Sequence, residues 1–76
     1  MKEIRFSRHA RRRVRLYKIP ESIVCEILTG MRLRAGEHEI IRIVSGFKYP
    51  LKIVFSVEGD TITVMTTYPL KRGRRK

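Results

Sequence analysis

This chain of 76 residues has few of the residues that most often form catalytic or metal sites: one cysteine, two histidines and seven acidic residues. A single cysteine excludes an internal disulfide, and a lone thiol suits a reducing compartment. No apolar run approaches the ~20 residues that span a bilayer, and the start, MKEIRFSR, lacks the apolar stretch of a signal peptide. We therefore expect a cytoplasmic protein that does not enter a membrane.

Acidic residues and amides are scarce as well. Seven Asp and Glu are scattered along the chain, which argues against a two-metal nuclease, and His38 has no second histidine or cysteine at a metal-ligand spacing. We expect neither a metal nor a cofactor. Asparagine and glutamine are absent, a bias typical of thermophile proteins that carries no information on function.

What the chain has in excess is positive charge. Eighteen Lys and Arg give a formal net charge of +11. Such a surface attracts polyanions and speeds encounters with them. Nucleic acid is therefore the favoured partner, ahead of a membrane surface.

The apolar periodicity changes from helical to strand-like along the chain. It predicts helices over 8–18 and 21–29, the first capped by Ser7 and the second stopped by Gly30. From Met31 the period becomes strand-like, and alternating or β-branched stretches at 2–7, 31–35, 37–44, 51–58 and 61–68 indicate strands. We expect an α+β fold with two N-terminal helices packed on one face of a three- to four-stranded antiparallel sheet. Residues 1–70 would form one domain, followed by a basic tail over 71–76.

The first predicted helix carries two kinds of basic residue. On a helical wheel Arg11, Arg15 and Lys18 point outward, whereas His9 and Arg13 lie one turn apart beside the apolar positions. We expect this pair to be half-buried. A cation there needs a glutamate or a bound phosphate as partner, and His9 is either a boundary histidine or a proton-exchanging group.

Cleavage of RNA without a metal needs a base, an acid and cations for the developing charge. Histidine titrates near neutral pH, and arginine offers a planar fork for phosphate oxygens. His9 and Arg13 are therefore candidate catalytic residues.

Two short motifs resemble a family of small prokaryotic proteins of unknown function. The matching residues are Ser7, His9, Ala10, Arg13 and Ile19, then Thr66, Tyr68 and Pro69 in TTYP. That family is similar to the barnase–EndoU–colicin–RelE fold group of metal-independent ribonucleases and toxins. The resemblance implies RNA as the substrate and His9, Arg13, Thr66 and Tyr68 as the catalytic residues of a RelE-like domain. The chain departs from the pattern at Tyr17 and Lys18, where Arg and Gly are usual, and at Pro20, where Ser is usual.

Strand alternation makes a separate prediction about the last strand. Thr66 and Tyr68 have the parity of Ile62 and Val64, so they should lie on the helix-packed face. Lys52 has the opposite parity to its apolar neighbours and should lie on the open face. Without a bulge, Lys52 and His9 cannot share a pocket.

Further candidates are basic or aromatic residues suited to binding nucleic acid. They are Arg8, Arg12, Lys48, Tyr49, Lys52, Lys71 and Arg72. Tyr49 and Lys48 either stack on bases or belong to a loop anchored by aromatics. The sequence thus favours an RNA-binding, toxin-like protein with metal-independent endoribonuclease activity. The alternatives are a non-catalytic nucleic-acid-binding module and a basic protein that docks an acidic, antitoxin-like partner.

Overall fold

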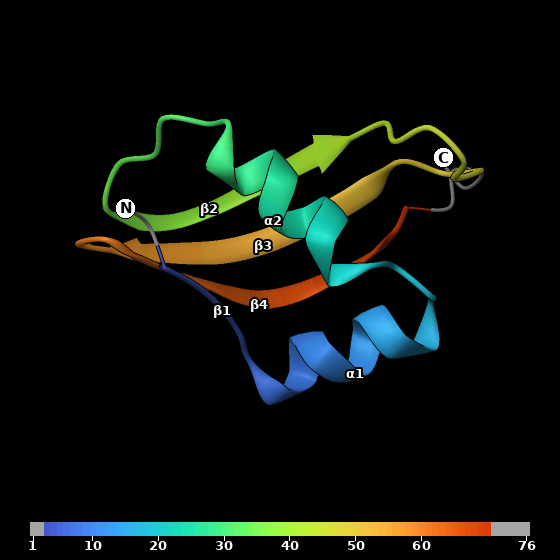
Figure 1. The fold of residues 1–76 in the computed structure, drawn as a ribbon, viewed down its shortest axis with the longest axis horizontal. Coiled ribbons are helices and arrows are strands. Elements are labelled where there is room, and N and C mark those ends of the chain that lie inside the picture. The colour runs from blue at the N-terminus through green and yellow to red at the C-terminus, as the bar shows by residue number, and fades with distance from the viewer. Residues whose placement is uncertain (1–2, 71–76) are drawn as a thin grey trace.

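The computed structural model describes residues 3–70, which form two helices and one four-stranded sheet (Figure 1). The elements follow in the order β1 (Glu3–Phe6), α1 (Arg8–Leu16), α2 (Glu21–Thr29), β2 (Gly36–Arg42), β3 (Leu51–Glu58) and β4 (Thr61–Pro69). The predicted α+β class is confirmed, and both helices and four of the five strand-like stretches are present, but 31–35 is a loop between α2 and β2. The predicted tail over 71–76 lies outside the described residues.

The sheet is mixed, with strand order β1-β4-β3-β2. β3 pairs antiparallel with both β2 and β4, but β1 pairs parallel with β4, from Glu3 opposite Thr61 to Phe6 opposite Val64. The expectation of an all-antiparallel sheet is therefore wrong. Alternation in a sequence shows which residues share a face, but it carries no information on strand direction.

The two helices do not share one face of the sheet. α2 lies across one face, whereas α1 runs along the edge of β4 beyond the end of β1 (Figure 1). The placement of both helices on a single face was thus wrong for α1. β1 is only four residues long and pairs with β4 only as far as Val64, so the outer edge of the second half of β4 has no described strand beside it and the helix that follows packs there.

Ser7 fixes the junction between β1 and α1, as its predicted capping role requires. Its Oγ accepts a hydrogen bond from the Ala10 N–H at 3.0 Å and donates one to the Met65 carbonyl at 3.0 Å. The Ser7 N–H donates to the Val64 carbonyl at 2.9 Å. One residue therefore caps the helix and attaches it to β4.

α1 ends at Leu16, two residues before its predicted end. Lys18 has a φ of 57°, in the left-handed region that non-glycine residues rarely adopt. This conformation turns the chain so that Ile19 enters the core, where its N–H donates to the Val14 carbonyl at 2.8 Å.

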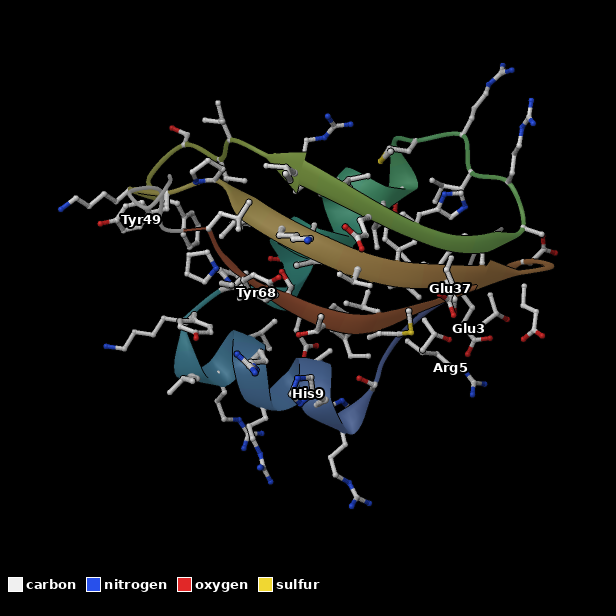
Figure 2. All side chains as sticks on the ribbon, turned by 180° about the vertical axis from the view of Figure 1, so that it is seen from behind. Glu3, Arg5, His9, Glu37, Tyr49 and Tyr68 are labelled. Carbon is white, nitrogen blue, oxygen red and sulfur yellow. The ribbon has the colours of Figure 1, made fainter. Side chains whose placement is uncertain are left out.

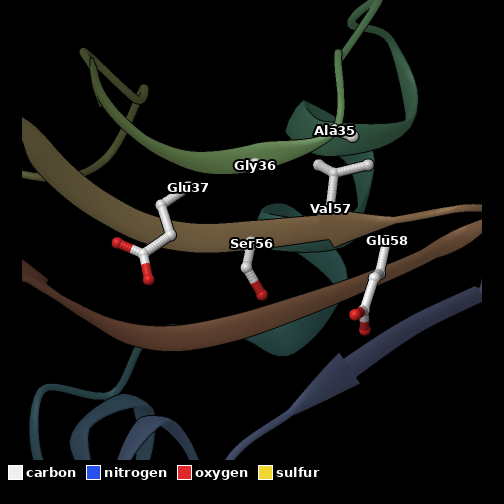
Figure 3. Close-up of a pocket in the computed structure, with 6 residues that line it drawn as sticks. All are labelled: Ala35, Gly36, Glu37, Ser56, Val57 and Glu58. Carbon is white, nitrogen blue, oxygen red and sulfur yellow. The ribbon is translucent and has the colours of Figure 1, made fainter.

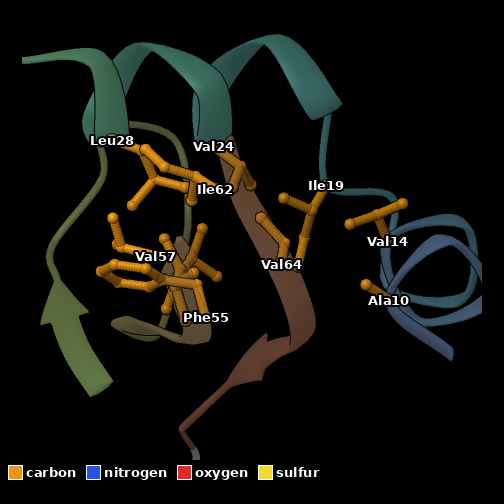
Figure 4. Close-up of a cluster of buried hydrophobic side chains, with 11 residues drawn as sticks. Ala10, Val14, Ile19, Val24, Leu28, Phe55, Val57, Ile62 and Val64 are labelled. Carbon is orange, nitrogen blue, oxygen red and sulfur yellow. The ribbon is translucent and has the colours of Figure 1, made fainter. Parts of the chain in front are cut away.

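The core lies between α2, the inner side of α1 and one face of the sheet (Figure 4). The sheet supplies the larger share of buried apolar side chains, and α1 adds only Ala10 and Val14. The whole set is Ala10, Val14, Ile19, Val24, Leu28, Leu51, Ile53, Phe55, Val57, Ile62 and Val64.

A β-bulge interrupts the pairing of β3 with β4. Phe55 is opposite Val64 and Val54 is opposite Thr66, so Met65 is an extra residue on β4. The alternation of β4 therefore reverses after Met65. Thr67 becomes the buried residue, with no exposed surface, and its hydroxyl has no hydrogen-bond partner among residues 3–70.

Candidate nucleic-acid interface

We call the face of the sheet opposite α2 the open face. The pairing of the strands assigns side chains to it from every strand, since residues opposite one another share a face. At one end lie Ile41, Lys52 and Tyr68, and Glu39, Val54 and Thr66 come next.

The bulge places Thr66 and Tyr68 on this open face. Their predicted position on the helix-packed face is wrong, because the extra residue Met65 shifts the alternation by one. Tyr68 lies opposite Lys52. The two side chains are therefore neighbours on one face, although strand alternation alone predicted that they lie on opposite faces. The predicted position of Lys52 on the open face is confirmed.

Lys52 belongs to a small polar group on the open face. Its Nζ lies 3.1 Å from Oε1 of Glu39, and its side chain is mostly covered. The pKa of Lys52 is raised, first by its hydrogen bond to Glu39 and further by the neighbouring Tyr68. Lys52 is therefore a fixed cation and is unsuited to act as a general base near neutral pH.

The surface of α1 turned away from the sheet carries a cluster of arginines. Four of them line a shallow hollow of about 290 Å³: Arg8, Arg11, Arg12 and Arg15. All four side chains are exposed. Residues 3–70 contain two ion pairs, Arg5–Glu3 and Lys52–Glu39, and neither involves α1. The four guanidinium groups therefore have no carboxylate partner in the described chain.

The structure brings Arg8 and Arg12, both predicted to bind nucleic acid, into this one cluster. Arg11 and Arg15 were expected only to point outward, and they line the same hollow. The spacing of the four, at positions i, i+3, i+4 and i+7, is the signal that reveals a shared helix face.

His9 is exposed, so the expectation that it is half-buried is wrong. Ala10 takes the buried position of this turn, and His9 lies on the flank of α1 that borders the open face (Figure 2). Arg13, one turn further on, is half-buried as predicted. The glutamate partner considered for Arg13 is not present within residues 3–70.

Four candidate catalytic residues thus lie on neighbouring elements. His9 and Arg13 are on α1, which runs along β4, and Thr66 and Tyr68 are on β4 itself. No hydrogen bond or ion pair joins the two pairs in the described part of the chain. The structure therefore sets them beside one another without a preformed contact.

The remaining candidates lie apart from α1. Tyr49 is half-buried in the loop before β3, and the Lys48 ammonium lies 5.8 Å from the centre of its ring. Phe47 in the same loop packs against the core, as in the anchored-loop alternative. Lys71 and Arg72 lie outside the described residues.

The opposite end of the open face is acidic. A hollow of about 330 Å³ there is lined by Ala35, Gly36, Glu37, Ser56, Val57 and Glu58. Figure 3 shows the carboxylates of Glu37 and Glu58 on the same side as the Ser56 hydroxyl. Two uncompensated carboxylates repel phosphate, so this end of the face is unfavourable for nucleic acid.

The described residues offer few other reactive groups. They contain no cluster of three or more His, Cys, Asp or Glu that could hold a metal ion. Burial, and then the charge of Glu21, raises the pKa of the Cys25 thiol, so it stays protonated at neutral pH and is a poor nucleophile. Neither helix of residues 3–70 has the length and hydrophobicity of a membrane-spanning segment.

No protein-family model matches the chain, and neither does any curated protein or solved structure. The resemblance in the SxHAxxR and TTYP motifs therefore stays a prediction, and the proposals below rest on the geometry of the residues themselves.

Proposed function

We propose that this protein binds RNA through α1. The observation that carries the proposal is the hollow lined by Arg8, Arg11, Arg12 and Arg15, four exposed guanidinium groups without a carboxylate partner in residues 3–70. Guanidinium forks bind phosphate oxygens in pairs, and a row of them along a helix suits a chain of phosphates. A cytoplasmic location fits this role, because the lone thiol of Cys25 suits a reducing compartment.

The flank of α1 supports RNA as the polyanion. α1 runs along β4, and the open face of β4 carries the phenol of Tyr68 and the hydroxyl of Thr66. Aromatic rings stack on unpaired bases, and hydroxyls form hydrogen bonds with bases and sugars. A bound RNA would place its phosphates on α1 and its bases on this part of the sheet.

Metal-independent cleavage of the bound RNA is the second candidate function. It is favoured by the exposure of His9, whose imidazole makes no hydrogen bond or ion pair within residues 3–70 and which lies one turn from Arg13. A histidine open to solvent can exchange a proton with substrate, while Arg13 would hold the phosphate. Thr66 and Tyr68 would orient the strand.

The binding proposal is tested with a short labelled RNA at several salt concentrations. The double variant Arg12→Ala/Arg15→Ala should bind about tenfold more weakly, and the slope of log affinity against log salt should fall by about 2. The matched control is Arg32→Ala/Arg34→Ala, which removes the same charge from the exposed loop before β2. Equal losses in both variants would show that only net charge matters and would overturn the α1 site.

Cleavage is tested with the same RNA in EDTA. Wild type should cleave it, His9→Ala should lose at least about a hundredfold in rate, and Arg13→Ala should lose less. His38→Gln is the matched control, because His38 stacks on Phe55 within the fold, with ring centroids 5.4 Å apart. RNA that binds but stays intact with wild type would leave a non-catalytic binding module. Failure to bind RNA, with co-purification of an acidic protein, would favour the docking alternative.

A further inference from the structure

The turn that ends α1 holds a lysine in a backbone conformation that favours glycine. Lys18 has a φ of 57°, and its N–H donates to the Arg15 carbonyl at 3.3 Å. The next N–H, of Ile19, donates to the Val14 carbonyl at 2.8 Å. These two hydrogen bonds form the Schellman motif, whose left-handed position is usually glycine. A Cβ there lies too close to the following carbonyl oxygen, so lysine is less favourable for the fold than glycine.

The fold requires this left-handed turn whatever residue occupies it. Val14 and Ile19 are both buried, so the chain must turn back into the core directly after α1. Pro20 is already the N-cap of α2, and no further residue is available for a wider connection. The backbone conformation of Lys18 is therefore set by its neighbours and does not depend on its side chain.

The side chain of Lys18 makes no interaction that offsets this strain. It is exposed, and it forms no hydrogen bond or ion pair within residues 3–70. A cation near a helix C-terminus is ordinarily favourable, but Arg13 and Arg15 already occupy the last turn of α1 without a carboxylate partner in the described chain. A third positive charge beside them adds repulsion. Backbone conformation and electrostatics therefore both disfavour lysine at this position.

A residue that is unfavourable for the fold in two ways is expected where its side chain acts on a ligand. Arg15 lines the hollow of α1, and the hydrogen bond from the Lys18 N–H to its carbonyl holds the two residues side by side. We propose that Lys18 is a fifth phosphate ligand of the α1 site and binds the RNA phosphate next to the one at Arg15. This inference rests on the proposed function. An ammonium on a flexible stem suits the end of the row, because it reaches a phosphate without the fixed geometry of a guanidinium.

The test compares the thermal unfolding and the RNA binding of three variants with those of wild type. Lys18→Gly relieves the strain and removes the charge, so its Tm should rise by about 4 °C while its affinity for RNA falls about threefold. The slope of log affinity against log salt should fall by about 1. Lys18→Arg keeps the charge and the strained backbone, so its Tm and its affinity should stay close to those of wild type. Arg32→Gly is the matched control, because it makes the same change of charge at an exposed loop residue, and it should bind RNA nearly as tightly as wild type without a rise in Tm.

A Lys18→Gly variant that binds RNA as tightly as wild type would overturn the proposal, and the α1 site itself would stand if Arg12→Ala/Arg15→Ala still weakens binding. A fall in the Tm of Lys18→Gly would also overturn it, since the lysine would then stabilise the end of α1. An equal loss of affinity in Arg32→Gly would assign the effect to net charge and overturn the assignment to Lys18. A wild type that does not bind RNA would overturn the proposed function and this inference together.

Discussion

At the scale of single residues, Thr67 is the side chain least suited to its surroundings. It is fully buried beside apolar neighbours, and its hydroxyl finds no partner within residues 3–70. An unsatisfied buried hydroxyl costs about 1–3 kcal/mol. The bulge at Met65 explains how it comes to be there, because regular alternation would have turned this residue toward the open face.

Replacement of the buried hydroxyl should therefore increase stability. Thr67→Val keeps the branched shape and removes the unpaired polar group, and we expect the free energy of unfolding to rise by about 1 kcal/mol. Urea unfolding followed by circular dichroism measures the change. Thr66→Val is the control, because Thr66 is half-buried on the open face, and its substitution should change stability by less than about 0.5 kcal/mol. A loss of stability in Thr67→Val would mean that the hydroxyl has a partner.

At the scale of elements, α1 depends on its attachment at Ser7. The helix buries only Ala10 and Val14, so its apolar contact with the sheet is small. Ser7 contributes the cap of the first turn and the bond to the Met65 carbonyl. The hydroxyl of Ser7 therefore contributes, with the Ser7 N–H and the buried Ala10 and Val14, to the position of the arginines relative to the sheet.

Removal of that hydroxyl should loosen α1. We expect Ser7→Ala to lower the free energy of unfolding by about 1–2 kcal/mol, the usual cost of a lost N-cap with an added hydrogen bond. Ser22→Ala, on the exposed side of α2, is the matched control and should change little. Chemical denaturation compares the two variants. Equal effects would show that Ser7 acts only through general helix propensity.

The elements themselves could be read from the sequence because local signals specify them. Ser7 and Gly30 mark where helices begin and end, and strict alternation over 51–58 marks the central strand, whose odd-numbered residues are buried. The pairing of the strands could not be predicted from the sequence. β1 and β4 are separated by more than fifty residues along the chain, and no local signal shows that they pair in parallel. The site was predicted only in part for the same reason. Arg13 is half-buried as expected. Tyr68 lies on the open face only because Met65 forms a bulge, which strand alternation does not reveal.

At the scale of the whole molecule, charge is unevenly distributed over the fold. The arginines of α1 lie at one edge of the sheet, and Glu37 and Glu58 lie at the far end of the open face. A polyanion approaching the open face is therefore attracted at the α1 side and repelled at the other. This asymmetry limits the proposed RNA contact to α1 and to the end of the sheet that carries Tyr68.

The bulge of β4 also marks where the neighbour of that strand changes. Before Met65 the edge of β4 is paired with β1, and after it the edge is bordered by α1. Deletion of this single residue would restore regular pairing with β3 and leave Tyr68 on its present face, because Val54 and Thr66 are already opposite each other. The carbonyl that holds Ser7 would be lost. Met65 therefore has two roles: its bulged conformation absorbs the extra residue and keeps Thr66 and Tyr68 on the open face, and its carbonyl anchors Ser7 at the start of α1.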